Sequence, residues 1–207
     1  MNFDEKARQW DLNPTRHERA QAVAEGIRRQ IPLRPNMTAL EYGCGTGLLS
    51  FELRSELGQI TLADRSAGML EVLREKITAT QAENMIPFQL DLLTDALPAQ
   101  RFDLIYSLMT LHHIPDTWGI LGCFYQLLLP GGYLCIADLD EEDGSFHNEA
   151  FDGHLGFNRQ ALAKLAMAVG FEVLGFETVY QMAKVVDNRQ RTYPIFLMTA
   201  RKQSILR

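Results

Sequence analysis

The chain has 207 residues, of which 46% are hydrophobic and 22% are charged, and its formal net charge at pH 7 is −6. This composition predicts one soluble globular domain with a full core and excludes a disordered chain. The negative charge argues against nucleic acid as a substrate, because neutralising phosphates normally needs a basic surface.

Apolar spacing and chain-breaking residues divide the sequence into alternating helices and strands. Residues 15–31 have helical spacing, with Thr15 as the expected N-cap and Pro32 after the last turn. Further helices are expected at about residues 48–57, 66–77, 117–129 and 158–169. Strands are expected at residues 37–42, 59–63, 86–90, 102–107, 133–137, 171–180 and 193–200.

This alternation predicts an α/β fold with a doubly wound, mostly parallel seven-stranded sheet and helices on both faces. The last two strands, joined by the polar residues 187–191, are expected to form an antiparallel hairpin at its edge. We expect a single domain over residues 1–207. Its parts are an N-terminal helical cover (1–36), a cofactor-binding core (37–137), a candidate substrate lid (138–157) and a C-terminal helix and hairpin (158–207).

The three cysteines, Cys44, Cys123 and Cys135, are an odd number without C-x-x-C spacing. We expect them to be reduced. No apolar stretch is long enough to span a bilayer, and the N-terminus is charged rather than signal-like. The sequence therefore predicts a cytoplasmic protein with no membrane partner, and it leaves the oligomeric state open.

Three alternating glycines follow the first expected strand. The run from Ala39 to Gly47 reads A-L-E-Y-G-C-G-T-G, and a helical segment begins directly after it. A strand that turns through glycines into a helix is typical of a cofactor-binding crossover. The dinucleotide pattern G-x-G-x-x-G fails here, because Leu48 stands where its third glycine belongs.

Acidic residues stand at the carboxyl ends of neighbouring strands, where ligands bind in doubly wound sheets. Asp64 ends the second strand, about 20 residues beyond the first glycine of the loop, where a carboxylate can accept hydrogen bonds from ribose hydroxyls. Asp91 ends the third strand, where it can accept an adenine amino group with Leu92 on the ring face. The alternative for both aspartates is that they only cap the following helix.

The pattern E-x-G-x-G-x-G resembles motif I of the class I S-adenosylmethionine-dependent methyltransferases. Later segments resemble further motifs of the small-molecule members in order and spacing, namely residues 64–69, Asp91, residues 102–106 with 111–115, and residues 129–132. The resemblance implies a Rossmann-like fold and S-adenosylmethionine as cofactor. It also implies methyl transfer to a small-molecule acceptor by in-line displacement.

Site residues are carried over from this resemblance position by position. Glu41, Gly43 and Gly45 are expected to line the methionine part, whose carboxylate backbone N–H groups can bind and whose ammonium Glu41 can attract. Asp64 is expected to bind ribose. The remaining expected cofactor contacts are Cys44 through its backbone, Arg65, Met69, Asp91, Leu92 and Ser107. Trp10 and the following aspartate resemble the cover that many members fold over the cofactor.

The loop after the fourth strand faces the methyl group in this fold. His113 is therefore the expected general base, if the acceptor must lose a proton. The alternative is that His112 or His113 only binds a loop carbonyl, with His112 the more structural of the two. Expected acceptor contacts are Trp10, His112, Asp138, Phe146 and His147, with His154 a further candidate base.

The acidic run at residues 138–143 opens the candidate lid. No metal is expected, although its carboxylates with His147 and His154 leave a metal site open as an alternative. An acidic lid would favour a cationic or neutral acceptor. Two other functions remain open. One is a non-catalytic cofactor-binding or adaptor protein of the same fold. The other is a nicotinamide-dependent oxidoreductase, which the missing third glycine disfavours.

Overall fold

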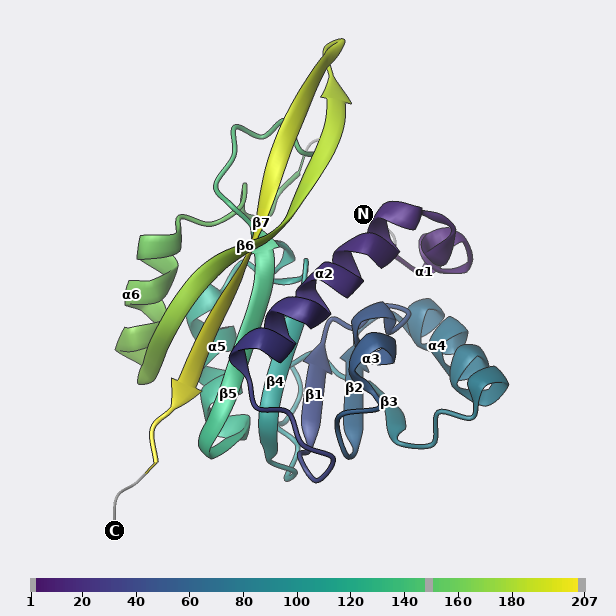
Figure 1. Cartoon of the computed structure of the whole chain (residues 1–207), viewed down its shortest axis with the longest axis vertical. Helices are drawn as coiled ribbons and strands as arrows, with labels where there is room; N and C mark the ends of the chain where they lie inside the picture. Colours follow the sequence, from purple (N-terminus) through teal and green to yellow (C-terminus); the bar gives the residue numbers. More distant parts are fainter. Residues whose placement is uncertain (1–2, 148–150, 205–207) are drawn as a thin grey trace.

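One sheet organises the computed structural model, which describes residues 3–147 and 151–204. Within these residues it has seven strands in the order β3-β2-β1-β4-β5-β7-β6 (Figure 1). They are β1 (Ala39–Tyr42), β2 (Ile60–Asp64), β3 (Met85–Gln89), β4 (Phe102–Leu108), β5 (Leu128–Leu139), β6 (Phe171–Val186) and β7 (Arg189–Lys202). Strands β1 to β5 pair in parallel, whereas β7 is antiparallel to β5 and β6. The predicted doubly wound sheet with its terminal hairpin is confirmed.

Helices cover both faces of this sheet. The helical elements are α1 (Phe3–Lys6), η1 (Ala7–Leu12), α2 (Pro14–Gln30), α3 (Leu48–Leu53), α4 (Ala67–Thr80), η2 (Leu111–His113), α5 (Thr117–Leu127) and α6 (Arg159–Val169). The apolar sides of α2, α3 and α4 pack in one core, and those of α5 and α6 in the other. Burial of these two apolar sets is the main stabilising contribution to the layered fold. No helix of the described part has the length and apolar character needed to cross a bilayer.

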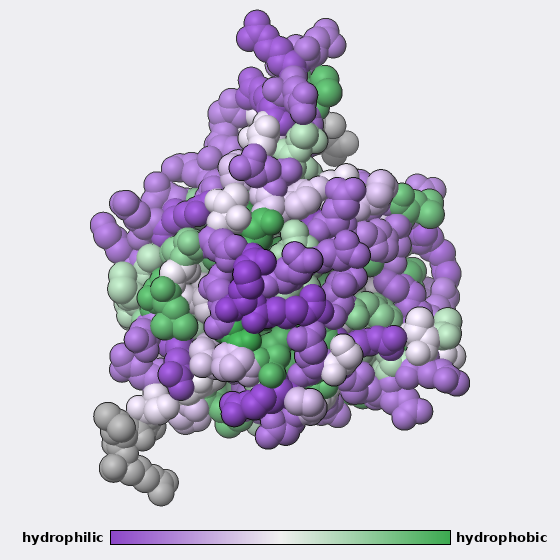
Figure 2. All heavy atoms as spheres, viewed as in Figure 1, coloured by the Kyte–Doolittle hydropathy of each residue, from purple (hydrophilic) through white to green (hydrophobic). Residues whose placement is uncertain are grey.

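The terminal hairpin is longer than the sequence predicts. Residues 187–191 are expected to be a polar connection, but the strands continue up to Val186 and resume at Arg189. Only Asp187 and Asn188 form the turn, with φ angles of 50° and 58°. Two left-handed residues make a tight turn that matches the twist of paired strands. The hairpin projects beyond the sheet (Figure 1), and its end is largely hydrophilic (Figure 2).

Strand β5 is also longer than predicted at both ends. It begins at Leu128, which pairs with Phe102, so α5 ends at Leu127 rather than at residue 129. At its other end it includes Asp138, which pairs with Phe196 of β7 and is fully buried. Asp138 therefore belongs to the sheet and not to the exposed segment that the sequence predicts from residue 138 onward.

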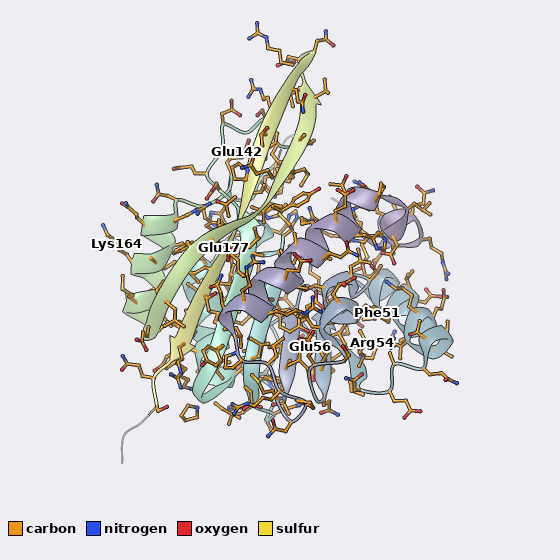
Figure 3. The ribbon with its side chains drawn as sticks, viewed as in Figure 1. Phe51, Arg54, Glu56, Glu142, Lys164 and Glu177 are labelled. Atoms are coloured by element: carbon orange, nitrogen blue, oxygen red, sulfur yellow. The ribbon has the colours of Figure 1, made fainter. Side chains whose placement is uncertain are left out.

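Helix α2 lies across the sheet and reaches its carboxyl end with the helix N-terminus (Figure 1). Near its C-terminal end, Arg28 pairs with Glu56 at 2.7 Å and Arg29 pairs with Glu177 of β6 at 2.5 Å. In Figure 3, Glu56 and Glu177 lie on opposite sides of this helix. Exposed ion pairs of this kind contribute little to the free energy of unfolding. Their partners nevertheless show how α2 is oriented on the sheet. Its first turns are thereby held next to the carboxyl ends of the strands.

Asn13, and not the expected Thr15, caps this helix. The Asn13 side chain accepts a hydrogen bond from the Thr15 backbone N–H at 3.0 Å, and Pro14 occupies the first helical position. Proline suits that position because its missing N–H would have no partner there. The sequence interpretation was wrong by two residues because it treated Asn13-Pro14 only as a stop for a preceding helix.

We expect Asn13→Ala to lower the free energy of unfolding by about 1 kcal/mol, since it removes the cap. Thr15→Ala serves as the control and should be nearly neutral. Chemical denaturation of the two variants measures both values. A larger loss for the threonine variant than for the asparagine variant would contradict this capping assignment.

Candidate functional site

The glycine loop follows β1 at the point where the strand order reverses. From β1 the chain proceeds to β2 and β3 on one side and then to β4 and β5 on the other, which is where doubly wound sheets bind ligands. Gly43, Gly45 and Gly47 have φ angles of 70°, 53° and 79°. A Cβ on Gly43 would stand 2.2 Å from the Thr110 side chain. Backbone conformation and close packing therefore both require glycine in this loop.

Asp64 at the end of β2 holds the glycine loop in place. Its Oδ2 accepts a hydrogen bond from the Gly45 N–H and its Oδ1 accepts one from the Ser66 N–H, both at 2.8 Å. Burial raises the pKa of Asp64, and these backbone hydrogen bonds oppose that effect. Ser66 itself caps α4 by accepting from Met69 N. Asp64 therefore binds the glycine loop, whereas the residue that caps α4 is Ser66.

Glu41 lies beneath the loop rather than on its surface. Its carboxyl group is 2% exposed and accepts hydrogen bonds from the backbone N–H and the hydroxyl of Ser50. The Ser50 hydroxyl also bonds the Tyr106 hydroxyl at 2.6 Å. Burial raises the pKa of Glu41 to about 8. The carboxyl group therefore ties α3 to β1 and β4, and its expected contact with a ligand ammonium stays a prediction.

The N-terminal segment covers the other side of the loop. Asp11 accepts hydrogen bonds from the Thr46 hydroxyl at 2.5 Å and from Lys76 Nζ at 2.6 Å. Lys76 also donates to the Thr46 carbonyl at 2.8 Å. Sequence reasoning missed Lys76, because nothing in the pattern of α4 separates it from other surface lysines. The lysine joins the cover to the loop through charge-assisted bonds.

Gly45 faces the space beneath this cover. Trp10 Nε1 and Met69 Sδ lie 3.8 Å and 3.9 Å from the position that a Gly45 Cβ would take. Ser107, at the end of β4, is 3% exposed, and its buried hydroxyl has no partner among the described residues. Buried polar atoms are normally hydrogen-bonded. An amino-acid or nucleoside ligand at this loop would supply the missing partner, so these residues fit such a cofactor.

The remaining expected cofactor contacts lie along the same edge of the sheet. Leu92 is 3% exposed and its backbone N–H donates to the Tyr42 hydroxyl at 3.1 Å. Asp91 Oδ1 accepts from Leu93 N at 3.1 Å within a turn, and no helix follows before β4, so Asp91 caps no helix; its Oδ2 accepts no bond from the described residues. Their roles, with those of exposed Arg65 and buried Cys44, stay predictions.

A buried histidine–aspartate pair stands at the ends of β4 and β5. His112 Nδ1 lies 2.6 Å from Asp138 Oδ1, and the His112 backbone N–H donates to Oδ2 at 3.1 Å. Leu139 N donates to Oδ1 at 2.8 Å. Burial alone would raise the pKa of Asp138, but the attraction of His112 and these hydrogen bonds together lower it. The ionised carboxylate keeps the proton on Nδ1, which leaves Nε2 as the basic nitrogen.

The neighbouring aromatic residues close over His112. The His113 ring centroid is 4.1 Å from that of His112. His147 and Phe151 stack on each other at 3.7 Å, with the His147 ring 5.6 Å from that of His112. Burial is the main cause that lowers the pKa of His113 to about 3 and that of His147 to about 4. Both rings are neutral at physiological pH, and His113 is a weak base.

Phe146, also an expected acceptor contact, points toward the hairpin. Its ring contacts Tyr193 at 5.3 Å and His147 at 4.9 Å between centroids. His154 hydrogen-bonds Thr117 and the Ile114 carbonyl through Nε2 at 3.1 and 3.0 Å, so this candidate base has a structural role. Phe146 therefore attaches the candidate lid to the hairpin, whereas His154 fixes the loop before α5.

Two aspartates of the acidic run in the candidate lid pair with arginines. Asp140 forms a bidentate pair with Arg159, both distances being 2.6 Å, and Asp143 pairs with Arg191 at 2.6 Å. The described residues contain no group of three ligands that could hold a metal ion. Residues 148–150 of the candidate lid lie outside the described part. Two carboxylates of the run are therefore paired with arginines, and its expected preference for a cationic or neutral acceptor stays a prediction.

Comparisons with known proteins show the family to which this chain is related. A family model described as a methyltransferase domain matches residues 15–175. The chain is 28% identical to a ubiquinone biosynthesis O-methyltransferase of Histophilus somni, over 67% of this chain and 61% of the relative. It is 25% identical to the 27-O-demethylrifamycin SV methyltransferase of Amycolatopsis mediterranei, over 62% of this chain and 48% of the relative. The chain thus spans about half to three fifths of the length of these relatives.

A solved structure extends the likeness to the whole fold. A SAM-dependent methyltransferase from Aquifex aeolicus superposes with a TM-score of 0.72 and 19% identity, covering 96% of this chain and 98% of that one. At this identity the superposition establishes the fold alone, while the family model supplies the relationship. The chain belongs to the class I S-adenosylmethionine-dependent methyltransferase family.

Proposed function

We propose that this protein transfers a methyl group from S-adenosylmethionine to a small-molecule acceptor whose proton is removed by the His112–Asp138 pair. The observation that carries the proposal is the glycine loop, tied to Asp64 at the switch point of the sheet and covered by Trp10. Bound there, the cofactor supplies an electrophilic methyl group with its own leaving group, so the protein has to align the acceptor and exclude water.

The cofactor half of the site extends from the glycine loop toward β3. We assign the amino-acid part to the loop backbone and the Ser107 hydroxyl, the ribose to Asp64, and the adenine to Asp91 and Leu92. Asp64 keeps a second lone pair on each oxygen after its two backbone hydrogen bonds, so it can still accept from sugar hydroxyls. Trp10 and Met69 would enclose the ligand from both sides of Gly45.

The acceptor half lies beside His112. His112 is preferred to His113 as the base because Asp138 fixes its tautomer and stabilises the imidazolium that forms. Depression of the His113 pKa to about 3 makes that ring a poor proton acceptor. His112 is only 2% exposed beneath His147 and Phe151, so these side chains must move before an acceptor can reach Nε2.

A small-molecule acceptor is favoured over nucleic acid by the net charge of −6. It is also favoured by the aromatic side chains around His112, which suit an enclosed apolar ligand. In this proposal residues 1–36 cover the cofactor, residues 37–137 bind it, and the segment from 138 to 157 contacts the acceptor. Catalysis is favoured over an adaptor role because the loop, Asp64 and the buried base are all present.

Calorimetric titration with S-adenosylmethionine, S-adenosylhomocysteine and NAD tests the proposed cofactor. We expect micromolar binding of the first two and none of NAD. Binding of NAD alone would overturn the proposal in favour of hydride transfer. Tight binding of the first two without turnover of any hydroxyl, amine or thiol acceptor would support the non-catalytic alternative.

Asp64→Asn should weaken S-adenosylhomocysteine binding by about 10- to 100-fold, because an amide replaces a charged acceptor opposite two sugar hydroxyls. Its NH₂ group would also face the backbone donors that Asp64 now accepts. Glu83→Gln, an exposed change just before β3 at the opposite end of the sheet, is the control. Unchanged affinity of the Asp64 variant would exclude a ribose contact at this position.

A further inference from the structure

A buried nitrogen atom of Arg19 has no hydrogen-bond partner among the described residues. Arg19 lies in the first half of α2, is partly buried, and has its Nε enclosed without an acceptor among the described residues. Burial and the neighbouring Arg16 lower the pKa of Arg19 to about 10, so the guanidinium remains a cation at neutral pH. A buried donor without an acceptor is costly, and a ligand that supplies the acceptor would remove that cost.

The carboxylates near Arg19 are bound to other groups. Asp138, whose charge acts on Arg19, uses both oxygens for His112 and Leu139. Glu18 accepts from the Tyr180 hydroxyl at 2.8 Å. Arg16 is a second cation of the same helix, and it stacks on Trp10 with 3.6 Å between its Cζ and the ring centroid. The space between α2 and the end of β5 therefore holds two arginines and the Asp138 carboxylate, whose two oxygens already accept bonds from His112 and Leu139, so Arg19 Nε has no acceptor there.

We propose that Arg19 binds an acidic group of the methyl acceptor, a carboxylate or a phosphate, and so makes the protein specific for anionic acceptors. This inference rests on the proposed function, because it concerns the acceptor half of that site. The charge of Asp138, at the end of β5, interacts with that of Arg19. Because β5 lies two strands away from the strand that precedes the glycine loop, we assign Arg19 to the acceptor rather than to the cofactor. The planar guanidinium presents several donors in a fork that matches both acidic groups.

The test uses three probes with the same ring, namely benzoate, phenyl phosphate and the uncharged benzamide. Each is titrated by calorimetry into the full-length protein saturated with S-adenosylhomocysteine. We expect at least one anion to bind about tenfold or more tightly than benzamide, and Arg19→Gln to abolish that advantage. Arg19→Lys keeps the charge without the fork and should retain part of it. Arg28→Gln, an ion-paired position of the same helix, is the matched control and should retain all of it.

Three results would overturn the inference. The first is equal binding of all three probes to the wild-type protein, and the second is an anion preference that persists in Arg19→Gln. The third is weaker S-adenosylhomocysteine binding in Arg19→Gln with unchanged binding of methylthioadenosine, which lacks the amino-acid part, because Arg19 would then bind the cofactor carboxylate. Absence of S-adenosylhomocysteine binding to the wild-type protein would instead refute the proposed function, and the anion preference can still be measured without the cofactor.

Discussion

His112→Gln is expected to lower kcat for methyl transfer to a hydroxyl acceptor by about 10²- to 10⁴-fold, the usual contribution of a positioned general base. Glutamine can still donate a hydrogen bond to Asp138, but it cannot take a proton from the acceptor. The affinity for S-adenosylhomocysteine should be unchanged, because His112 lies beyond the glycine loop. Formation of S-adenosylhomocysteine at saturating cofactor, with an acceptor that the wild-type protein methylates, measures the rate.

His113→Gln is the matched control, one residue along the same turn. We expect less than about a tenfold loss, because the low pKa of His113 makes it a weak base. Inactivity of the His113 variant with retained activity of the His112 variant would restore the base predicted from the sequence. Equal, small losses in both variants would mean that the acceptor needs no base.

Asp138→Ala is expected to reduce the free energy of unfolding by about 3 kcal/mol or more, because each buried donor that loses its acceptor costs about 1–3 kcal/mol. The carboxylate is fully buried and accepts from two backbone N–H groups and one ring nitrogen. All three donors would lose their acceptor together. Chemical denaturation at pH 7 measures the loss. Asp140→Ala, which breaks a more exposed pair, should cost only about 0–1 kcal/mol.

The same variant also tests how the stability contribution of Asp138 depends on pH, and the direction of that dependence can be predicted. The pKa of Asp138 is lower in the folded protein than in the unfolded chain, so its contribution is complete above the unfolded value of about 4. As the pH falls through the folded pKa, that contribution is lost. The stability difference between the wild-type protein and Asp138→Ala should therefore shrink below about pH 4. A difference that grows on acidification would contradict an ionised Asp138.

The cofactor side of the site could be predicted from sequence because its chemistry is local. The glycines of the loop are required because the backbone there has positive φ angles. The position of Asp64 can be predicted because it ends a strand whose apolar residues form a continuous run in the sequence. Apolar runs broken by glycine and proline likewise specify the alternation of strands and helices, and hence the parallel sheet. Strand ends were less certain, as β5 illustrates, because pairing with β4 and β7 extends a strand beyond its apolar run.

The residues proposed for the acceptor side come together only in the tertiary structure. His112 and Asp138 are 26 positions apart, and no local pattern says which of two adjacent histidines turns toward the aspartate. Lys76 and Asp11 are 65 positions apart, and Arg19 reaches the site only because α2 crosses the sheet. The sequence by itself determined the sheet and the glycine loop through backbone conformation and hydrophobic periodicity. The proposed base, the arginine pairs of the acidic run and the unpartnered Arg19 Nε depend on contacts between distant segments, which form only when the layers pack.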